Sequence, residues 1–269
     1  MSALLIVSCV KDEVYNTLHP DKGAVSMRVS LPQGMGDYTV EIDGQSVQGS
    51  ETTLVYPFLL SLGEHTLLMY NHPDGLTIAD GIARVNALTL IKSNTNTILP
   101  MPGYLYSIST MCKVMADDTV RIEFAPLRRM RDLRFELTVT EGDPERIASV
   151  AGVLSGIAGT YTLATELLGG ESMTTALAFT RDGDRVTADA RLLGTVGEAQ
   201  MLVLTLHFTD GKAQTIRNDL TEMLKTFNSD MQTPLKISGT LLTPTVVTPG
   251  TATIIGWQIQ EEVDDTVIN

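Results

Sequence analysis

The chain has 269 residues, of which 43% are hydrophobic and only 5% aromatic, and its net charge is −13. This length allows one large domain or two ordinary ones, each able to bury its own core. The negative charge argues against nucleic acid and anionic lipid as partners, because both would repel the chain. Beyond the first residues no apolar run is long enough to span a bilayer, so we expect a chain that is soluble or anchored only at its end.

The chain begins with a short apolar segment that ends in a cysteine. Residues 4–9 are Leu-Leu-Ile-Val-Ser-Cys, and a charged run follows directly, as at the end of a secretory signal. The last four residues resemble the lipobox of bacterial lipoproteins, which implies cleavage before Cys9 and diacylglycerol on its sulfur. The segment is short and no lysine or arginine precedes it, which a start codon assigned too late would explain. The alternative is that residues 4–9 form a buried strand of the first domain.

Cys112 is the second of the two cysteines. If Cys9 carries lipid, Cys112 has no partner for an intrachain disulfide, and the stability of the fold must come from its core. The apolar neighbours of Cys112 predict a small buried side chain rather than a reactive thiol.

After a tether that ends at residue 22, residues 23–126 are predicted to form an N-terminal β-sandwich. Apolar and polar residues alternate from Val25 to Leu31 and from Tyr38 to Ile42, the pattern of half-buried strands. Asp43-Gly44 predicts a tight hairpin turn. Strands of about six residues, with turns about every eight to twelve residues, continue to residue 124 and favour a sandwich or barrel.

Residues 127–269 are predicted to form a C-terminal β-sandwich. A proline and a run of four arginines over residues 126–134 mark the domain boundary. The alternation from Leu133 to Val139 is the clearest strand pattern in the chain. Glycines within residues 147–159 predict a bulge or a close backbone approach. One short helix is expected near residues 218–227, where apolar residues recur at helical spacing.

The side chains that usually perform catalysis or bind metals are not arranged as a site. The four histidines, His19, His65, His72 and His207, show no metal-ligand spacing, and Asp182-Gly183 predicts a hairpin turn rather than a calcium loop. No nucleophile elbow, phosphate loop or dinucleotide fingerprint is present. We therefore expect no enzyme, no cofactor and no metal. The arginines of residues 128–134 are expected to pair with the protein's own carboxylates across the domain boundary, the alternative being an acidic partner or a lipid phosphate.

Three features together resemble the FimB/Mfa2-type fimbrial subunits of Bacteroidales. They are a lipobox cysteine before a tether, two all-β domains, and a block of arginines, strand and turn that leads to Leu154-Ser155-Gly156-Ile157-Ala158-Gly159. The resemblance implies two transthyretin-like β-sandwiches, a lipid anchor in the outer membrane, and fimbriae that assemble by strand exchange. In stalk subunits of the family a protease cuts after an arginine near the first strand. Arg28 lies inside a predicted strand, which favours an anchor or accessory subunit.

We therefore predict a surface lipoprotein with a structural role in adhesion or fimbria assembly, held in the outer membrane by lipid on Cys9. Its expected partners are other fimbrial subunits, with no nucleic acid. The predicted subunit contact comprises Val246, Val247, Ile254, Ile255, Trp257 and Ile259. Trp257 is alternatively a core side chain or a stacking platform for a sugar.

Two other functions stay open. The first is a glycan-binding surface lipoprotein of a polysaccharide-uptake system, against which the low aromatic content argues. The second is a hydrolase on a β scaffold, which would need a histidine gathered with carboxylates. The sequence offers no such constellation.

Overall fold

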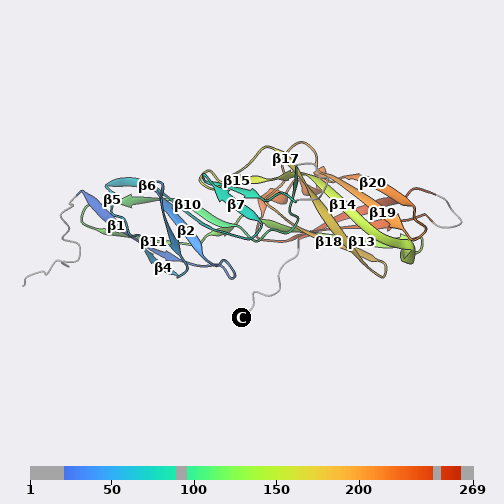
Figure 1. Ribbon diagram of the computed structural model, residues 1–269, viewed down its shortest axis with the longest axis horizontal. Helices are drawn as coiled ribbons and strands as arrows, with labels where there is room; N and C mark the ends of the chain where they lie inside the picture. The colour runs from blue at the N-terminus through green and yellow to red at the C-terminus, as the bar shows by residue number, and fades with distance from the viewer. Residues whose placement is uncertain (1–20, 89–95, 245–249, 262–269) are drawn as a thin grey trace, which may run out of the picture. The chain divides into compact units, whose positions relative to one another are not determined.

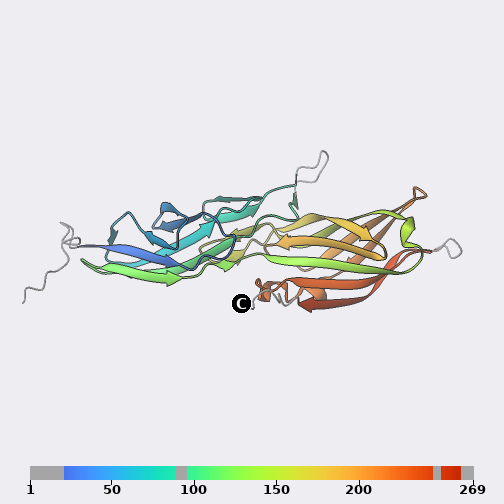
Figure 2. The same ribbon diagram turned by 90° about the horizontal axis from the view of Figure 1, so that it is seen from below.

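The computed structural model describes residues 21–88, 96–244 and 250–261. The described residues form strands almost throughout (Figures 1 and 2), as expected for an all-β fold. They divide into two compact units, the first formed by residues up to 71 together with 108–126, and the second by 72–107 together with the residues from 127 onward. Residues 72–107 were expected in the N-terminal sandwich. They group with the second unit because β8 (Ile82–Val85) pairs with β15 (Thr160–Thr162).

The first unit contains two sheets that share a buried core. One sheet has the order β11-β1-β4 with β5 also on β1, and the other contains the order β10-β6-β2-β3. Val25, Met27 and Val29 of β1 are buried while Arg28 is exposed, which confirms the predicted alternation. The strands are β1 (Lys22–Val29), β2 (Tyr38–Ile42), β3 (Gln45–Gly49), β4 (Thr53–Val55), β5 (Leu60–Ser61), β6 (Gly63–Asn71), β10 (Tyr106–Val114) and β11 (Thr119–Phe124).

The second unit is built on one long sheet with the order β20-β19-β14-β17-β18-β13-β21-β22. Besides β8 and β15, the earlier strands of the second unit are β7 (Leu76–Ala79), β9 (Thr97–Ile98), β12 (Leu127–Arg128), β13 (Arg131–Glu141), β14 (Ile147–Ala158) and β16 (Leu167–Leu168). The later ones are β17 (Ser172–Asp182), β18 (Arg185–Leu192), β19 (Met201–Phe208), β20 (Ala213–Asp219), β21 (Leu235–Leu242) and β22 (Thr253–Glu261). A small sheet of order β16-β15-β8-β7 accompanies the long one.

Strand β17 joins the two halves of the long sheet. Its residues up to Phe179 pair with β14, and its residues from Thr180 pair with β18. The strands at the two ends of the long sheet are β20 and β22. The Gln214 side chain of β20 contacts the segment just before β22, where it donates to the Gly250 carbonyl at 3.1 Å and accepts from the Ala252 N–H at 2.7 Å. Alternate residues of β13 and β19 are fully buried, as in a sandwich core.

The predicted helix is shorter than expected. Only α1 (Thr221–Leu224) is helical, and a 3₁₀ turn follows at Phe227–Ser229. The predicted apolar face is confirmed, because Leu220, Leu224 and Phe227 are fully buried. The segment then turns at Asp230, whose carboxylate accepts from the Gln232 N–H at 2.7 Å. This Asx-type contact competes with continuation of the 3₁₀ turn.

The glycine-bearing stretch of β14 contains the predicted bulge. Its pairing with β17 shifts register between Ser155 and Ile157, and Gly156 between them has a φ of 77°. A Cβ at Gly156 would lie 2.3 Å from the Ala199 carbonyl oxygen. Both the left-handed backbone and this close approach therefore require glycine.

We expect Gly156→Ala to lower the free energy of unfolding of the second unit by about 2–3 kcal/mol. Urea denaturation followed by the fluorescence of Trp257, the only tryptophan, measures it. Gly170→Ala is the matched control, because a Cβ there meets no atom within 4 Å, and it should change stability by less than about 0.5 kcal/mol. Equal effects of the two substitutions would contradict the bulge argument.

His65 is a buried histidine of the first unit, in β6. Its Nδ1 lies 2.6 Å from Asp43 Oδ2 and its Nε2 lies 2.8 Å from the Ser61 carbonyl oxygen. Both neighbours are acceptors, so the ring satisfies them when it carries both protons. Burial lowers the pKa of His65, but the hydrogen bonds to Ser61 and Asp43 outweigh burial and raise the pKa above its ordinary value of 6.5.

Because the folded pKa of His65 is raised, its contribution to stability is complete below the unfolded pKa and is lost as pH rises through the folded pKa. We expect the unfolding temperature of the first unit to fall as the pH rises above about 6.5, as measured by calorimetry. Asp43→Asn should flatten this dependence, and asparagine tolerates the positive φ of that position. An unchanged slope in the variant would contradict the assignment.

Candidate functional site

The C-terminal edge of the long sheet carries the predicted subunit contact. Strand β22 pairs antiparallel with β21 from Leu235 to Leu242, and no other described strand pairs with it. Ile255 and Ile259 of β22 are 50% and 39% exposed. An edge strand with exposed apolar side chains offers free backbone donors and acceptors to a further strand.

The six predicted contact residues do not share one environment. Ile255 and Ile259 are exposed, whereas Ile254 is buried in the core. Trp257 is half-buried against Gly239, where an added Cβ would lie 3.0 Å from the indole ring. This favours the core interpretation of Trp257 over a sugar platform. Val246 and Val247 lie outside the described residues.

A buried arginine holds the end of β22 in place. Arg131 of β13 is fully buried, and its Nη2 donates to Glu261 of β22 at 3.2 Å. Its Nε donates to the Thr233 carbonyl at 2.5 Å and its Nη1 to the Phe227 carbonyl at 3.0 Å. One side chain therefore joins β13, the turn after α1 and the last described residue of β22.

The other arginines of the run also find partners within the protein. Arg129 pairs with Glu166, and Arg134 lies 3.9 Å from Asp189. Arg128 donates to the carbonyls of Met231 and Gln232. Pairing with the protein's own carboxylates is thus confirmed for Arg129, Arg131 and Arg134. The predicted position across the domain boundary is wrong, because these partners lie in the second unit itself.

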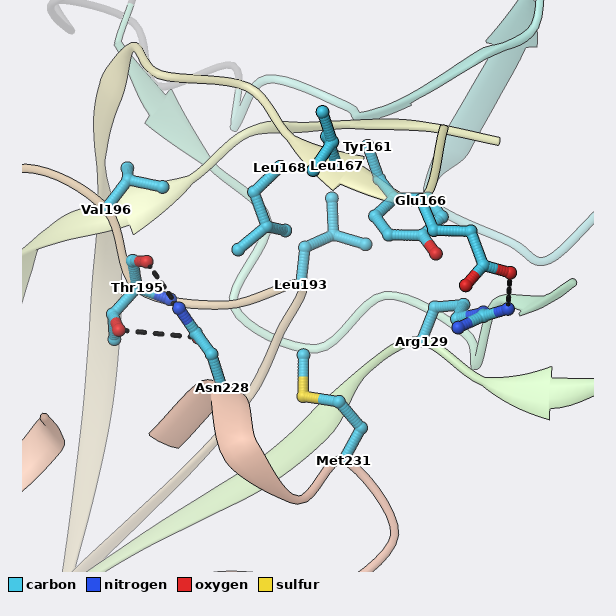
Figure 3. A pocket seen from close by; sticks show the side chains of 10 residues that line it. All are labelled: Arg129, Tyr161, Glu166, Leu167, Leu168, Leu193, Thr195, Val196, Asn228 and Met231. Carbon is cyan, nitrogen blue, oxygen red and sulfur yellow. Dashed lines mark hydrogen bonds and ion pairs between the residues drawn. The ribbon is translucent and has the colours of Figure 1, made fainter. Parts of the chain in front are cut away.

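A cavity of about 520 Å³ lies in the second unit (Figure 3). Its apolar wall consists of Leu167, Leu168, Leu193, Val196 and Met231. The Arg129–Glu166 ion pair and Tyr161 form one polar end, and Asn228 with Thr195 forms the other. This volume and mostly apolar lining are typical of small-ligand sites.

Asn228 pairs with Thr195 and Arg129 pairs with Glu166, whereas the buried Tyr161 hydroxyl has no hydrogen-bond partner within the described part of the chain. Asn228 accepts from the Thr195 N–H through Oδ1 at 2.8 Å and donates to the Thr195 carbonyl through Nδ2 at 2.8 Å. Burial raises the pKa of Tyr161 to about 12, so its phenol stays neutral at physiological pH. The cavity therefore offers shape and apolar contact, without an activated nucleophile or base. Its lining comes from segments far apart in the chain, which no local sequence pattern connects.

Cys112 is a free, buried cysteine, as expected. Burial and the charge of Asp43 raise the pKa of its thiol, which lowers its reactivity. Within the described ranges, no group of three or more histidine, cysteine or acidic side chains is placed to hold a metal ion. In the same part of the chain, no helix is both long and apolar enough to cross a membrane.

Comparison with solved structures identifies the fold. No protein-family model matches the sequence, and no curated protein matches it. The fimbrial anchor protein Mfa2 from Porphyromonas gingivalis superposes with a TM-score of 0.65 at 14% identity, covering 88% of this chain and 97% of that one. The chain has the fold of Mfa2. The predicted resemblance to Mfa2-type subunits and the predicted all-β sandwich fold are thereby confirmed.

Two further structures share this fold. A candidate adhesin from Bacteroides ovatus superposes with a TM-score of 0.64 at 16% identity, over 92% of this chain and 99% of that one. A candidate polysaccharide-binding protein from Bacteroides thetaiotaomicron gives a TM-score of 0.57 at 10% identity, over 90% and 99% of the two chains. At these identities the likeness establishes the fold alone.

Proposed function

We propose that this protein is a structural subunit of a surface fimbria, in the position of an anchor or accessory subunit. The observation that carries the proposal is the exposed edge of β22 with Ile255 and Ile259, in a fold shared with a fimbrial anchor. An extended segment of a neighbouring subunit adds to this edge through main-chain hydrogen bonds, and pockets for alternate side chains supply specificity.

The contact between Arg131 and Glu261 supports this form of strand addition. Glu261 ties β22 to the core of its own subunit through Arg131, and Ile254 is buried beside β21. Strand β22 therefore stays with its own subunit, and its free edge is the part that receives a neighbour. The neighbour completes the sheet rather than displacing its last strand.

We further propose that diacylglycerol on Cys9 holds the protein in the outer membrane. The proposal rests on the lipobox sequence of residues 6–9, which lies outside the described residues. A lipid attached there would provide the membrane affinity that the net charge of −13 disfavours for anionic surfaces.

Metabolic labelling with an alkyne fatty acid tests the lipid. The wild-type protein should carry the label, and Cys9→Ala should lose it because the acylated thiol is gone. Cys112→Ala should keep the label because that thiol is buried. An unlabelled wild type, or equal labelling of Cys9→Ala, would show that the protein is not lipidated at this residue.

Glycan binding is the second candidate function. The cavity of about 520 Å³ and the fold shared with a candidate polysaccharide-binding protein favour it. Against it, the aromatic ring in the lining, Tyr161, is buried beneath Arg129, whose guanidinium lies 5.8 Å from the ring centroid. Saturable binding on a glycan array that Leu168→Trp abolishes would favour this function over a structural one.

A further inference from the structure

The start of β1 is surrounded by two other segments of the first unit. On one side β5 pairs with it, Ser61 opposite Lys22 and Leu60 opposite Gly23. On the other side the turn before β11 approaches, where the Asp117 N–H donates to the Lys22 carbonyl at 3.2 Å. Neighbouring strands lie about 5 Å apart, so side chains of both segments stand around the point where the chain enters the fold. Figure 1 shows β5 beside the beginning of β1.

Large apolar side chains are exposed around this point. They are Phe58 (42% exposed), Leu59 (39%), Leu62 (48%) and Met115 (58%), and we call them the N-terminal apolar patch. Single exposed apolar residues are ordinary, but several gathered around one point indicate an interaction surface.

The patch is held by the core beneath it. The ring of Phe58 meets the buried ring of Tyr56 edge-on, with centroids 5.5 Å apart. The Tyr56 hydroxyl in turn donates to the Gln45 carbonyl at 2.6 Å. Leu59 and Leu62 flank β5, which is fixed by its pairing with β1. These contacts restrict Phe58, Leu59 and Leu62, which lowers the entropic cost of binding.

The position of the patch along the chain indicates what covers it. Lys22 follows Cys9 by 13 positions, and a chain of that length reaches at most about 45 Å when fully extended. If Cys9 carries lipid, as proposed above, the patch is confined within that distance of a bilayer. Such confinement raises the effective concentration of the second contact, so that weak apolar contacts become occupied.

We propose that the N-terminal apolar patch inserts into the interface of the membrane that holds the lipid on Cys9, and so fixes the orientation of the first unit on it. The patch is bordered by exposed Glu64, Asp117 and Asp118, against Lys22 and Lys113. This acidic border repels anionic headgroups, so the surface that it fits is a zwitterionic one. The proposal rests on the lipidation of Cys9 for its role in the cell.

The test uses Cys9 as a chemical handle. In the full chain, Trp257→Phe with Phe58→Trp leaves one tryptophan, at position 58. This variant is coupled through Cys9 to a maleimide lipid in phosphatidylcholine vesicles, while the buried Cys112 stays unmodified. Brominated acyl chains should quench the new tryptophan strongly. Ser30→Trp is the control, because Ser30 is exposed just beyond the far end of β1, eight residues or about 26 Å along the strand from Lys22, and its quenching should be clearly lower.

Two further arms make the outcome decisive. Leu59→Ser with Leu62→Ser should reduce the quenching of the tryptophan at position 58 to that of the control, while circular dichroism without vesicles shows the same fold. Phosphatidylglycerol vesicles should also give less quenching. Equal quenching at positions 30 and 58 would contradict insertion of the N-terminal apolar patch. Equal or stronger quenching in the anionic vesicles would contradict the preference for zwitterionic headgroups. Because the coupling supplies the tether itself, these results are independent of whether the cell acylates Cys9.

Discussion

Arg131→Ala is expected to lower the free energy of unfolding of the second unit by about 3–5 kcal/mol, the range for breaking a buried charged network. The substitution removes a fully buried side chain and leaves a cavity. It also takes the donor from the carbonyls of Phe227 and Thr233 and the ion-pair partner from Glu261. Urea denaturation followed by Trp257 fluorescence measures the change, because Trp257 lies in the strand that Arg131 holds.

Arg134→Ala is the matched control for this prediction. Arg134 lies on the same strand, but its side chain is half-exposed and stands 3.9 Å from Asp189. An exposed pair of this kind contributes at most about 1 kcal/mol. If the two alanine variants lose similar stability, Arg131 does not have the central role assigned to it.

Charging the free edge of β22 is expected to abolish the co-purification of a neighbouring fimbrial subunit. Ile255→Lys with Ile259→Lys places charges on exposed side chains, and charges on an edge strand oppose the addition of another strand. The subunit recovered with the protein should fall more than tenfold, which corresponds to at least about 1.4 kcal/mol of contact free energy. Lipid labelling at Cys9 should not change.

Deleting residues 245–269 should have the same effect on co-purification, and it also removes Glu261 from Arg131. The double lysine variant separates the loss of the β22 edge from the loss of the Arg131–Glu261 contact, because it keeps that contact. Val153→Lys serves as its control, since Val153 is an exposed apolar residue of β14, a strand paired on both sides. Undiminished co-purification in the double lysine variant would refute the contact at β22.

Local patterns predicted much of this fold. The alternation from Leu133 to Val139 places every second side chain in the core, and Asp43-Gly44 forms the predicted turn, with positive φ at both residues. The burial of Arg131 was also readable in principle, because it has the same parity in β13 as Leu133 and opposite parity to Arg134. The run of charges marks the arginines as a group, but only their parity along the strand distinguishes the buried Arg131 from the exposed Arg134.

Non-local pairing could not be predicted in this way. The pairing of β8 with β15, where Arg84 is opposite Thr160, joins segments that no short pattern relates, and it moves residues 72–107 into the second unit. The cavity has the same origin, because Arg129, Tyr161 and Asn228 meet only once the long sheet has formed. Helix length was also misjudged, because the helix predicted to reach Phe227 ends at Leu224 and a 3₁₀ turn takes over at Phe227–Ser229.

Site-specific photocrosslinking in cells shows whether a neighbouring subunit lies against the free edge of β22. A photoreactive phenylalanine replaces Ile255 on the free edge of β22, and the same residue replaces Val153 on the central strand β14 as the control; both positions are exposed. We expect a crosslink from position 255 to another fimbrial subunit and none from position 153. No crosslink from position 255, or the same product from both positions, would contradict this expectation.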